Sequence, residues 1–445
     1  MFRAATFLIA AWVLAAAAGC GSSAPGRINI IWITWDSTRA DHLSSYGYAR
    51  PTSPNVDALA EQAVLFETAI AQHNWTQPSY ASMLTSLHFW QMPGWTLSPD
   101  NLTLSEILAA HGYDTFGFVQ NPNLAADFHF DQGFDVYERL PDSTTPGEMN
   151  DLVLPRLPGL AAAQRPFFLF VHYQGPHFPY REDNPFNEEF VGAAEALLTA
   201  QEGLDAMASH GAVWAADEAK VAYLTDMYDA SIRATDAALG ELVAALDQAG
   251  LWEDSLVIFN SDHGDEFYDR GEFGHATYNV YPELTFVPLI VRFPARMAIA
   301  PRRVTASVQN LDIAPTVLDV VGIPVPGHFV GASLLPLDEV GSDADRLAYS
   351  NIGAYVAIRS STRTLVHHYG GDPEAAAGPL VYDRGADPRE RRPLSASNDA
   401  AGAMLYERGL QWYQIIQAQE QLDMAGKTEL SEELAAALRA LGYLR

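Results

Sequence analysis

The sequence predicts an α/β fold in which helices cover both faces of a mostly parallel sheet. Short apolar runs rich in β-branched and aromatic residues recur along the chain, and longer stretches with helical periodicity separate them. Such alternation is typical of a mostly parallel sheet. The 445 residues, 48% of them hydrophobic, suffice for one large domain with an appendage or for two or three smaller domains.

The first 27 residues are typical of a bacterial lipoprotein signal followed by a tether. Arg3 supplies a positive charge, the apolar run 5–18 is short for a membrane span, and small residues precede Cys20. We expect a signal peptide over residues 1–19, a flexible tether over 20–27 and a lipid on Cys20. The mature protein would then be anchored outside the cytoplasm, with the bacterial outer membrane favoured. An ordinary secretory signal with an incidental cysteine is the alternative.

Four apolar runs predict central strands, at 28–35, 167–173, 256–260 and 287–292. The clearest helix is expected over 222–249, where apolar residues recur on one face, and a second over 312–321. In open α/β sheets, functional sites gather beyond the carboxyl ends of the strands. Polar residues that directly follow the apolar runs are therefore the first candidates for a site.

The charge of the chain excludes some partners and some chemistries. Its 26 basic and 55 acidic residues give a formal charge of −29, which counts against nucleic acid as a partner. Lys220 and Lys427 are the only lysines, so a site that needs positive charge must use arginine, histidine or a metal ion. Cys20 is the only cysteine, which excludes a cysteine nucleophile in the body of the chain.

Polar clusters follow several of the apolar runs, and together they contain the residue types of a metal-assisted nucleophile. The clusters place Asp36 after the first run, Thr76 in the segment 74–80, His177 after the run 167–173, Asp262 and His263 after the run 256–260, and His275 a little further on. Each cluster alone is weak evidence, because an aspartate after a strand is more often a helix cap than a ligand. Two carboxylates, several histidines and a hydroxyl at strand ends form a much more specific combination.

These clusters resemble the sulfatase-like branch of the alkaline phosphatase superfamily. The resemblance extends over nearly all of the chain after the tether, in motifs at 36–48, 52–59, 76–79, 176–180, 261–266, 287–292, 312–318 and 438–444. It implies a doubly wound, mostly parallel α/β domain over 28–347 and a small C-terminal α+β subdomain over 348–445, with strands near 354–359 and 364–368. It also implies cleavage of a small-molecule, glycan-type or lipid-type ester at sulfur or phosphorus, with a divalent metal ion.

The resemblance also implies roles for individual residues. Asp36, Asp262 and His263 match the positions of metal ligands, and Thr76 matches the nucleophile, which also contacts the metal. His177 and His275 match the positions that bind the substrate oxyanion and protonate the leaving group. These roles are chemically consistent, because a threonine hydroxyl needs activation by a cation and histidine can act as a general acid near neutral pH.

The sequence departs from the sulfatase pattern in ways that bear on its chemistry. Typical members oxidise a Cys or Ser to formylglycine in a signature that continues with Arg, whereas this chain has Thr76 and Tyr80. Threonine cannot form that aldehyde. The two active-site lysines of sulfatases are missing as well, which leaves the metal and Arg39 or Arg292 as candidate sources of positive charge.

The metal expectation also differs from that of typical sulfatases. Ser37 replaces the second carboxylate of the usual pair, and His263 stands where many members have Asn. Fewer hard oxygen ligands and one imidazole favour zinc or manganese, with calcium and magnesium as alternatives.

Three functions are compatible with the sequence. The favoured one is a hydrolase or transferase that cleaves a phosphate ester, preferably a phosphodiester, through Thr76. The second is a sulfuric ester hydrolase that works without formylglycine. The third is a non-catalytic surface binding protein built on the sulfatase fold. The substrate and the oligomeric state are left open by the sequence.

Overall fold

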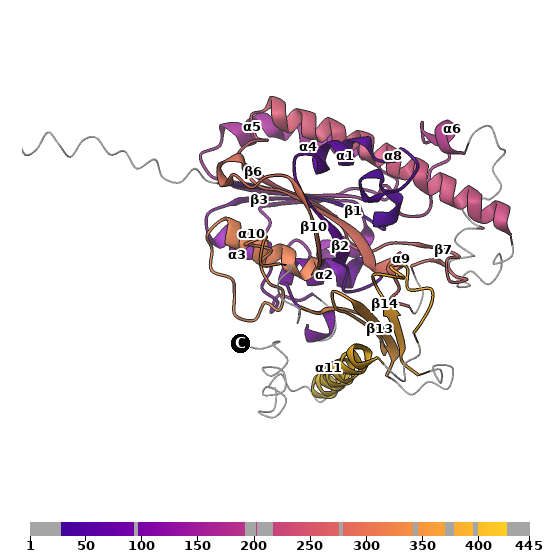
Figure 1. Cartoon of the computed structure of the whole chain (residues 1–445). Coiled ribbons are helices and arrows are strands. Elements are labelled where there is room, and N and C mark those ends of the chain that lie inside the picture. The colour runs from indigo at the N-terminus through magenta and orange to yellow at the C-terminus, as the bar shows by residue number, and fades with distance from the viewer. Residues whose placement is uncertain are drawn as a thin grey trace, which may run out of the picture.

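The computed structural model contains an eight-stranded central sheet and a separate four-stranded sheet near the C-terminus (Figure 1). It describes residues 28–424 except 93–96, 192–201, 203–216, 276–278, 341–345, 370–377 and 395–398. The central sheet has the order β10-β2-β9-β6-β1-β5-β3-β4. Its strands are β1 (Asn29–Trp35), β2 (Val64–Ile70), β3 (Asp114–Val119), β4 (Val136–Arg139), β5 (Phe167–Tyr173), β6 (Ser255–Ser261), β9 (Phe286–Arg292) and β10 (Arg302–Gln309).

Within the central sheet, β9 runs antiparallel to both of its neighbours, and the other pairings are parallel. Residue Trp35 at the end of β1 pairs with Tyr173 of β5 and with Ser261 of β6. The carboxyl ends of these three strands therefore meet at one edge of the sheet. This confirms the prediction of a mostly parallel sheet, and it shows that the first three predicted strands lie side by side.

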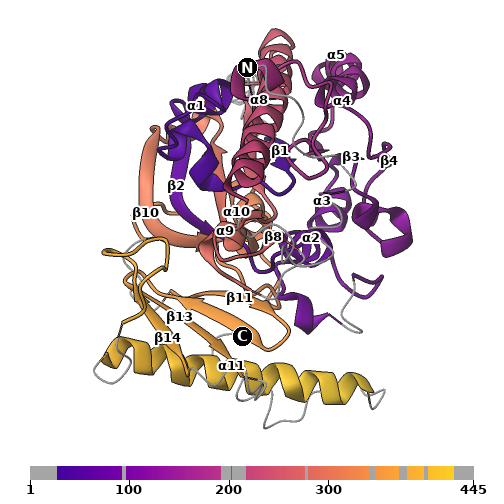
Figure 2. The same ribbon diagram turned by 90° about the vertical axis from the view of Figure 1, so that its right-hand side faces the viewer.

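Helices cover both faces of the central sheet (Figures 1 and 2). One face carries α1 (Pro54–Ala60), α4 (Pro146–Val153), α5 (Leu157–Ala162) and the long α8 (Glu218–Gln248). The other face carries α2 (Thr76–Thr85), α3 (Leu104–Ala110) and α10 (Ile313–Val320). Short helices α6 (Asn187–Phe190) and α9 (Pro282–Thr285) lie in connections, as does the two-stranded ribbon of β7 (Glu266–Phe267) and β8 (Phe273–Gly274).

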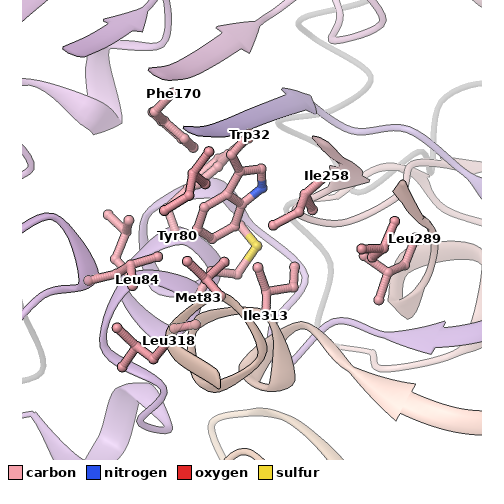
Figure 3. Packing of buried hydrophobic residues seen from close by; sticks show 14 of the residues in the cluster. Trp32, Tyr80, Met83, Leu84, Phe170, Ile258, Leu289, Ile313 and Leu318 are labelled. Atoms are coloured by element: carbon pink, nitrogen blue, oxygen red, sulfur yellow. The ribbon is translucent and has the colours of Figure 1, made fainter. Parts of the chain in front are cut away.

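The helix that begins at Thr76 is held by close packing against the central sheet. Its side chains Tyr80, Met83 and Leu84 lie against Trp32 of β1 and against Ile313 of α10 (Figure 3). All of these side chains are buried. Burial of large apolar side chains is worth about 1.5–3 kcal/mol for each, so the first turn of α2 has a fixed position on the sheet.

The C-terminal subdomain is an antiparallel sheet backed by a long helix (Figure 2). Its strands are β11 (Ala348–Ile352), β12 (Tyr355–Arg359), β13 (Arg363–His368) and β14 (Leu380–Asp383), and α11 (Ala400–Met424) packs across them. Predicted strands at 354–359 and 364–368 are thus confirmed. The domain boundary predicted at residue 348 coincides with the start of β11.

Several predictions concern residues outside those that the structure describes. They are the signal peptide 1–19, the tether 20–27 with Cys20, and the motif at 438–444. Among the described helices, none has the length and apolar character that crossing a membrane requires.

Candidate active site

Asp36, Asp262 and His263 come together at the carboxyl edge of the sheet. Asp36 directly follows β1, and Asp262 and His263 directly follow the neighbouring strand β6. One ligand atom from each residue lies within 4.8 Å of the other two, and all three side chains are fully buried. The parallel pairing of β1 with β6 is therefore what brings these sequence-distant side chains into one group.

Hydrogen bonds orient the Asp262 carboxylate through one of its oxygens and leave the other without a hydrogen-bond donor among the described residues. Its Oδ1 accepts the backbone N–H of Ser37 at 3.1 Å and that of His263 at 2.9 Å. Its Oδ2 is buried and accepts no hydrogen bond from the residues that the structure describes. Burial and the neighbouring Asp36 carboxylate raise the pKa of Asp262. A buried oxygen without a donor, beside a second carboxylate, is what a bound cation would stabilise.

His263 turns its Nε2 atom toward the carboxylates of Asp262 and Asp36. Its Nδ1 donates to the Gly264 carbonyl at 2.8 Å, which leaves a lone pair on Nε2. That Nε2 lies 3.3 Å from Asp262 Oδ2 and 3.8 Å from Asp36 Oδ1. Burial and the nearby His275 lower the pKa of His263, which keeps the imidazole neutral. Two carboxylates and one neutral imidazole suit a divalent metal ion, so the residues present fit one.

Two residues that the sequence analysis did not assign hold Asp36 in place. His172 accepts the Gln120 backbone N–H on Nδ1 and donates from Nε2 to Asp36 Oδ2 at 3.2 Å. Asn121 donates to the same Asp36 oxygen at 2.7 Å. Such partners of a ligand set its orientation and basicity. His172 lies inside β5, one residue before its end, where the pattern of the strand gives no sign of a functional side chain.

Thr76 lies at the first position of α2 with its hydroxyl facing this group. Its Oγ1 is 3.5 Å from His263 Nε2 and 3.3 Å from Asn121 Nδ2. The side chain is 1% exposed, while the preceding Trp75 is 38% exposed. The hydroxyl therefore lies between His263, one of the three candidate ligands, and an amide donor.

His177 and His275 complete the group of predicted residues. The His275 ring centre lies 5.0 Å from that of His177 and 4.5 Å from that of His263. His275 Nδ1 is 2.8 Å from the buried Asp265 Oδ1. Burial lowers the pKa of His275, but the Asp265 carboxylate outweighs it and raises the pKa above its usual value. Asp265 follows the aspartate–histidine pair by two residues and was not assigned from the sequence.

The two arginines considered as sources of positive charge have other partners. Arg39 is buried and forms ion pairs with Asp41 at 2.8 Å and with Asp269 at 2.6 Å. Arg292 ends β9, which runs antiparallel to β6, so it lies at the opposite edge and binds the Trp252 carbonyl. The expectation for Arg292 was therefore wrong. Tyr80, at the signature's arginine position, bonds Thr34 Oγ1 at 2.8 Å beneath the site.

The fold and the site together define a class, the metal-dependent ester hydrolases of the alkaline phosphatase superfamily. The family model described as Sulfatase matches residues 28–323, and that described as N-sulphoglucosamine sulphohydrolase, C-terminal, matches residues 271–404. The chain belongs to the sulfatase family. Enzymes of this family use a divalent metal ion.

Individual relatives are distant but extend over most of the chain. The N-acetylglucosamine-6-O-sulfatase of Bacteroides thetaiotaomicron is 25% identical over 86% of this chain and 85% of its own. The multifunctional alkaline phosphatase superfamily protein PehA of Trinickia caryophylli is 24% identical over 72% of this chain and 78% of its own. The solved phosphonate monoester hydrolase of Agrobacterium radiobacter has a TM-score of 0.69 at 24% identity, covering 92% of this chain and 99% of that one.

Proposed function

We propose that the protein is a hydrolase or transferase that cleaves phosphate esters through Thr76, with phosphodiesters preferred. The observation that carries the proposal is the position of Thr76 Oγ1, between His263 and Asn121 at the start of α2. A buried hydroxyl beside one of the candidate metal ligands supports its assignment as the nucleophile.

The metal would be held by Asp36, Asp262 and His263, with Thr76 as a fourth contact, and the imidazole ligand favours zinc or manganese. When bound, it would lower the pKa of the threonine hydroxyl and neutralise charge on the ester oxygens. Thr76 gives its hydroxyl proton to water as Oγ1 attacks phosphorus and the bond to the leaving oxygen breaks, and His177 or His275 gives that oxygen a proton. Water or an alcohol then displaces Thr76 from phosphorus and gives its proton back to the same histidine. Thr76 Oγ1 regains a proton from water, which completes hydrolysis or transfer.

Phosphorus is favoured over sulfur because of how the covalent intermediate must be opened. A formylglycine sulfate collapses by expelling sulfate from a geminal diol, and threonine has no second hydroxyl for that step. A threonine phosphate can be opened by a second in-line displacement with the same groups. The side chain beside Thr76 is the neutral amide of Asn121. Lys220, the one lysine among the described residues, lies in the first turn of α8 and has no assigned role in the site.

The test compares a phosphodiester, a phosphonate ester and an aryl sulfate with the same leaving group. We expect the phosphorus esters to react faster, and Thr76→Ala to lower that rate at least about a hundredfold, equivalent to about 2.7 kcal/mol. Thr85→Ala, at the other end of α2, serves as the control for damage to the helix. Faster turnover of the sulfate would support the sulfuric ester alternative, and absence of metal-dependent turnover would support the non-catalytic one.

We further propose that the protein is lipid-anchored through Cys20 outside the cytoplasm. The support is the sequence of the first 27 residues, with small residues before Cys20 and Gly21 after it. Metabolic labelling with a fatty acid should mark the wild-type protein. Label that persists in Cys20→Ser would refute the assignment.

A further inference from the structure

A large cleft opens beside the candidate active site. It has a volume of about 1080 Å³, and Asn121 and His177 lie in its wall. The rest of the wall comes from the segments 142–147 and 174–186 and from one side of α8. Pockets of about 300–1,000 Å³ are typical for drug-sized ligands, so the space suits a leaving group larger than a simple alcohol. We call this space the leaving-group cleft.

His177 places the cleft on the side where a leaving group would depart. His177 is one of the two candidate proton donors to the leaving oxygen, and its neighbours Phe178 and Pro179 continue along the wall. Phe178 is buried, and together with Ala234 and Ala237 of α8 it supplies apolar surface. An alcohol released at His177 would therefore have its hydrocarbon or sugar body beside this surface.

The charged side chains in the wall are mostly carboxylates. They are Asp142, Glu182, Asp183 and Glu241, against one basic side chain, Arg181. That arginine donates to Asp183 at 2.8 Å and to the Ser143 carbonyl at 2.8 Å, so its charge is already balanced within the wall. Glu182 and Glu241 form no ion pair with a basic residue in the described part of the chain.

The N-terminus of α4 also borders the cleft, but its partial positive charge is already balanced. Thr145 and Pro146 lie in the wall, and an exposed helix N-terminus there would attract anions. The Glu148 carboxylate accepts the Thr145 backbone N–H at 2.7 Å, and Thr145 Oγ1 accepts the Glu148 N–H at 3.1 Å. This capping box satisfies the helix end with a carboxylate. The charged side chains of the wall therefore give the cleft a negative character that the start of α4 does not offset.

We propose that the leaving-group cleft binds the alcohol portion of the ester and that this alcohol carries a positive charge, as a protonated amino alcohol or amino sugar does. This rests on the proposed ester cleavage at Thr76. The apolar wall accepts the body of the alcohol, while Glu182 and Glu241 attract its ammonium group. An acidic leaving group, such as a uronic acid, would be repelled by the same carboxylates.

The experiment uses two methyl phosphodiesters whose aryl leaving groups have the same shape and different charge. One phenol carries a para trimethylammoniomethyl group and the other its uncharged isostere, a para neopentyl group. The ratio of kcat/KM, cationic over neutral, is measured in the wild type, Glu182→Gln, Glu241→Gln and the double variant. Intrinsic reactivity cancels when the ratio is compared between variants. Glu61→Gln, which changes an exposed carboxylate outside the wall of the cleft, is the matched control.

We expect each cleft variant to lower the ratio about two- to fivefold, which is the range for partly exposed charge pairs. The control should leave it unchanged, and the wild-type ratio should fall as salt is added. A ratio that is the same in the wild type and the double variant would overturn the proposal.

A binding measurement tests the cleft separately from the proposed ester cleavage. If no ester is cleaved, the dissociation constants of the two free phenols are measured by calorimetry in the same variants. Tighter binding of the cationic phenol that is lost in the double variant would support the cleft without the chemistry. Equal binding of both phenols would refute the cleft assignment as well.

Discussion

Glu390→Gln should destabilise the protein far more than the loss of an average ion pair. Glu390 and Arg359 are both fully buried, and the Arg359 Nε and Nη2 donate to the two Glu390 oxygens at 3.1 and 3.3 Å. Breaking a buried pair by removing one partner leaves an uncompensated charge and costs about 3–5 kcal/mol. Because Gln keeps one acceptor oxygen for Arg359, we expect the lower end of that range, about 3 kcal/mol.

The pair also connects the C-terminal subdomain to residues on both sides of His275. Arg359 Nη2 donates to the Val280 carbonyl at 2.7 Å, and Arg270 Nη1 donates to the Glu390 carbonyl at 2.9 Å. Arg270 and Val280 are thereby each bonded to the C-terminal subdomain. Loss of the Glu390 charge should therefore lower the stability of the whole chain rather than of the C-terminal subdomain alone.

Urea unfolding followed by tryptophan fluorescence measures the effect, with the midpoint compared at equal slope. Glu67→Gln is the control, because Glu67 pairs with Arg303 at the surface, where such pairs are worth about 0–1 kcal/mol. An apolar double replacement, Arg359→Met with Glu390→Leu, should recover much of the loss because it removes both charges. Equal midpoints for Glu390→Gln and Glu67→Gln would refute this reasoning.

Two further predictions concern the metal and the pH dependence of stability. Asp36→Ala or Asp262→Ala should weaken metal binding by several kcal/mol, and unchanged metal content by elemental analysis would contradict the ligand assignment. Burial raises the pKa of Glu266 from its usual value to about 7, so between pH 4.5 and 7 the folded state retains a proton that the unfolded chain has lost. Stability should then fall as pH rises through this window. Glu266→Gln should remove that slope from a plot of Tm against pH, and a slope unchanged by the substitution would count against this origin.

The sequence was sufficient to predict the position of the site residues that directly follow a strand. Asp36, Asp262 and His263 follow apolar runs, and parallel pairing then forces them together, so their proximity could be anticipated without coordinates. The direction of β9 could not be inferred from its apolar run, because a buried strand has the same composition in either direction. Arg292 was consequently placed at the wrong edge of the sheet.

Other parts of the site depend on contacts that no local pattern reports. His172 is an interior strand residue, and its role arises only because β5 lies beside β1 and turns the ring toward Asp36. Asn121 follows β3 by two residues and reaches both Asp36 and Thr76 across β5. Asp265 could have been noticed in its motif, but its pairing with His275 depends on the β7–β8 ribbon between them.

The charge of the site favours a phosphodiester over a phosphate monoester, but it does not favour a phosphodiester over a sulfate ester. A divalent cation would balance Asp36 and Asp262, the Asp265 carboxylate stands against His275, and Arg39 is paired with Asp41 and Asp269. Little fixed positive charge is then left for a dianionic phosphate monoester. A phosphodiester and an aryl sulfate each carry a single negative charge, so both satisfy this constraint equally. The preference for phosphorus consequently depends only on the step that opens the covalent intermediate. A sulfated threonine lacks the geminal hydroxyl through which formylglycine expels sulfate. Thr76→Cys combined with Tyr80→Arg would restore the signature in which the aldehyde forms, and the ratio of sulfate to phosphodiester turnover in the oxidised variant should rise.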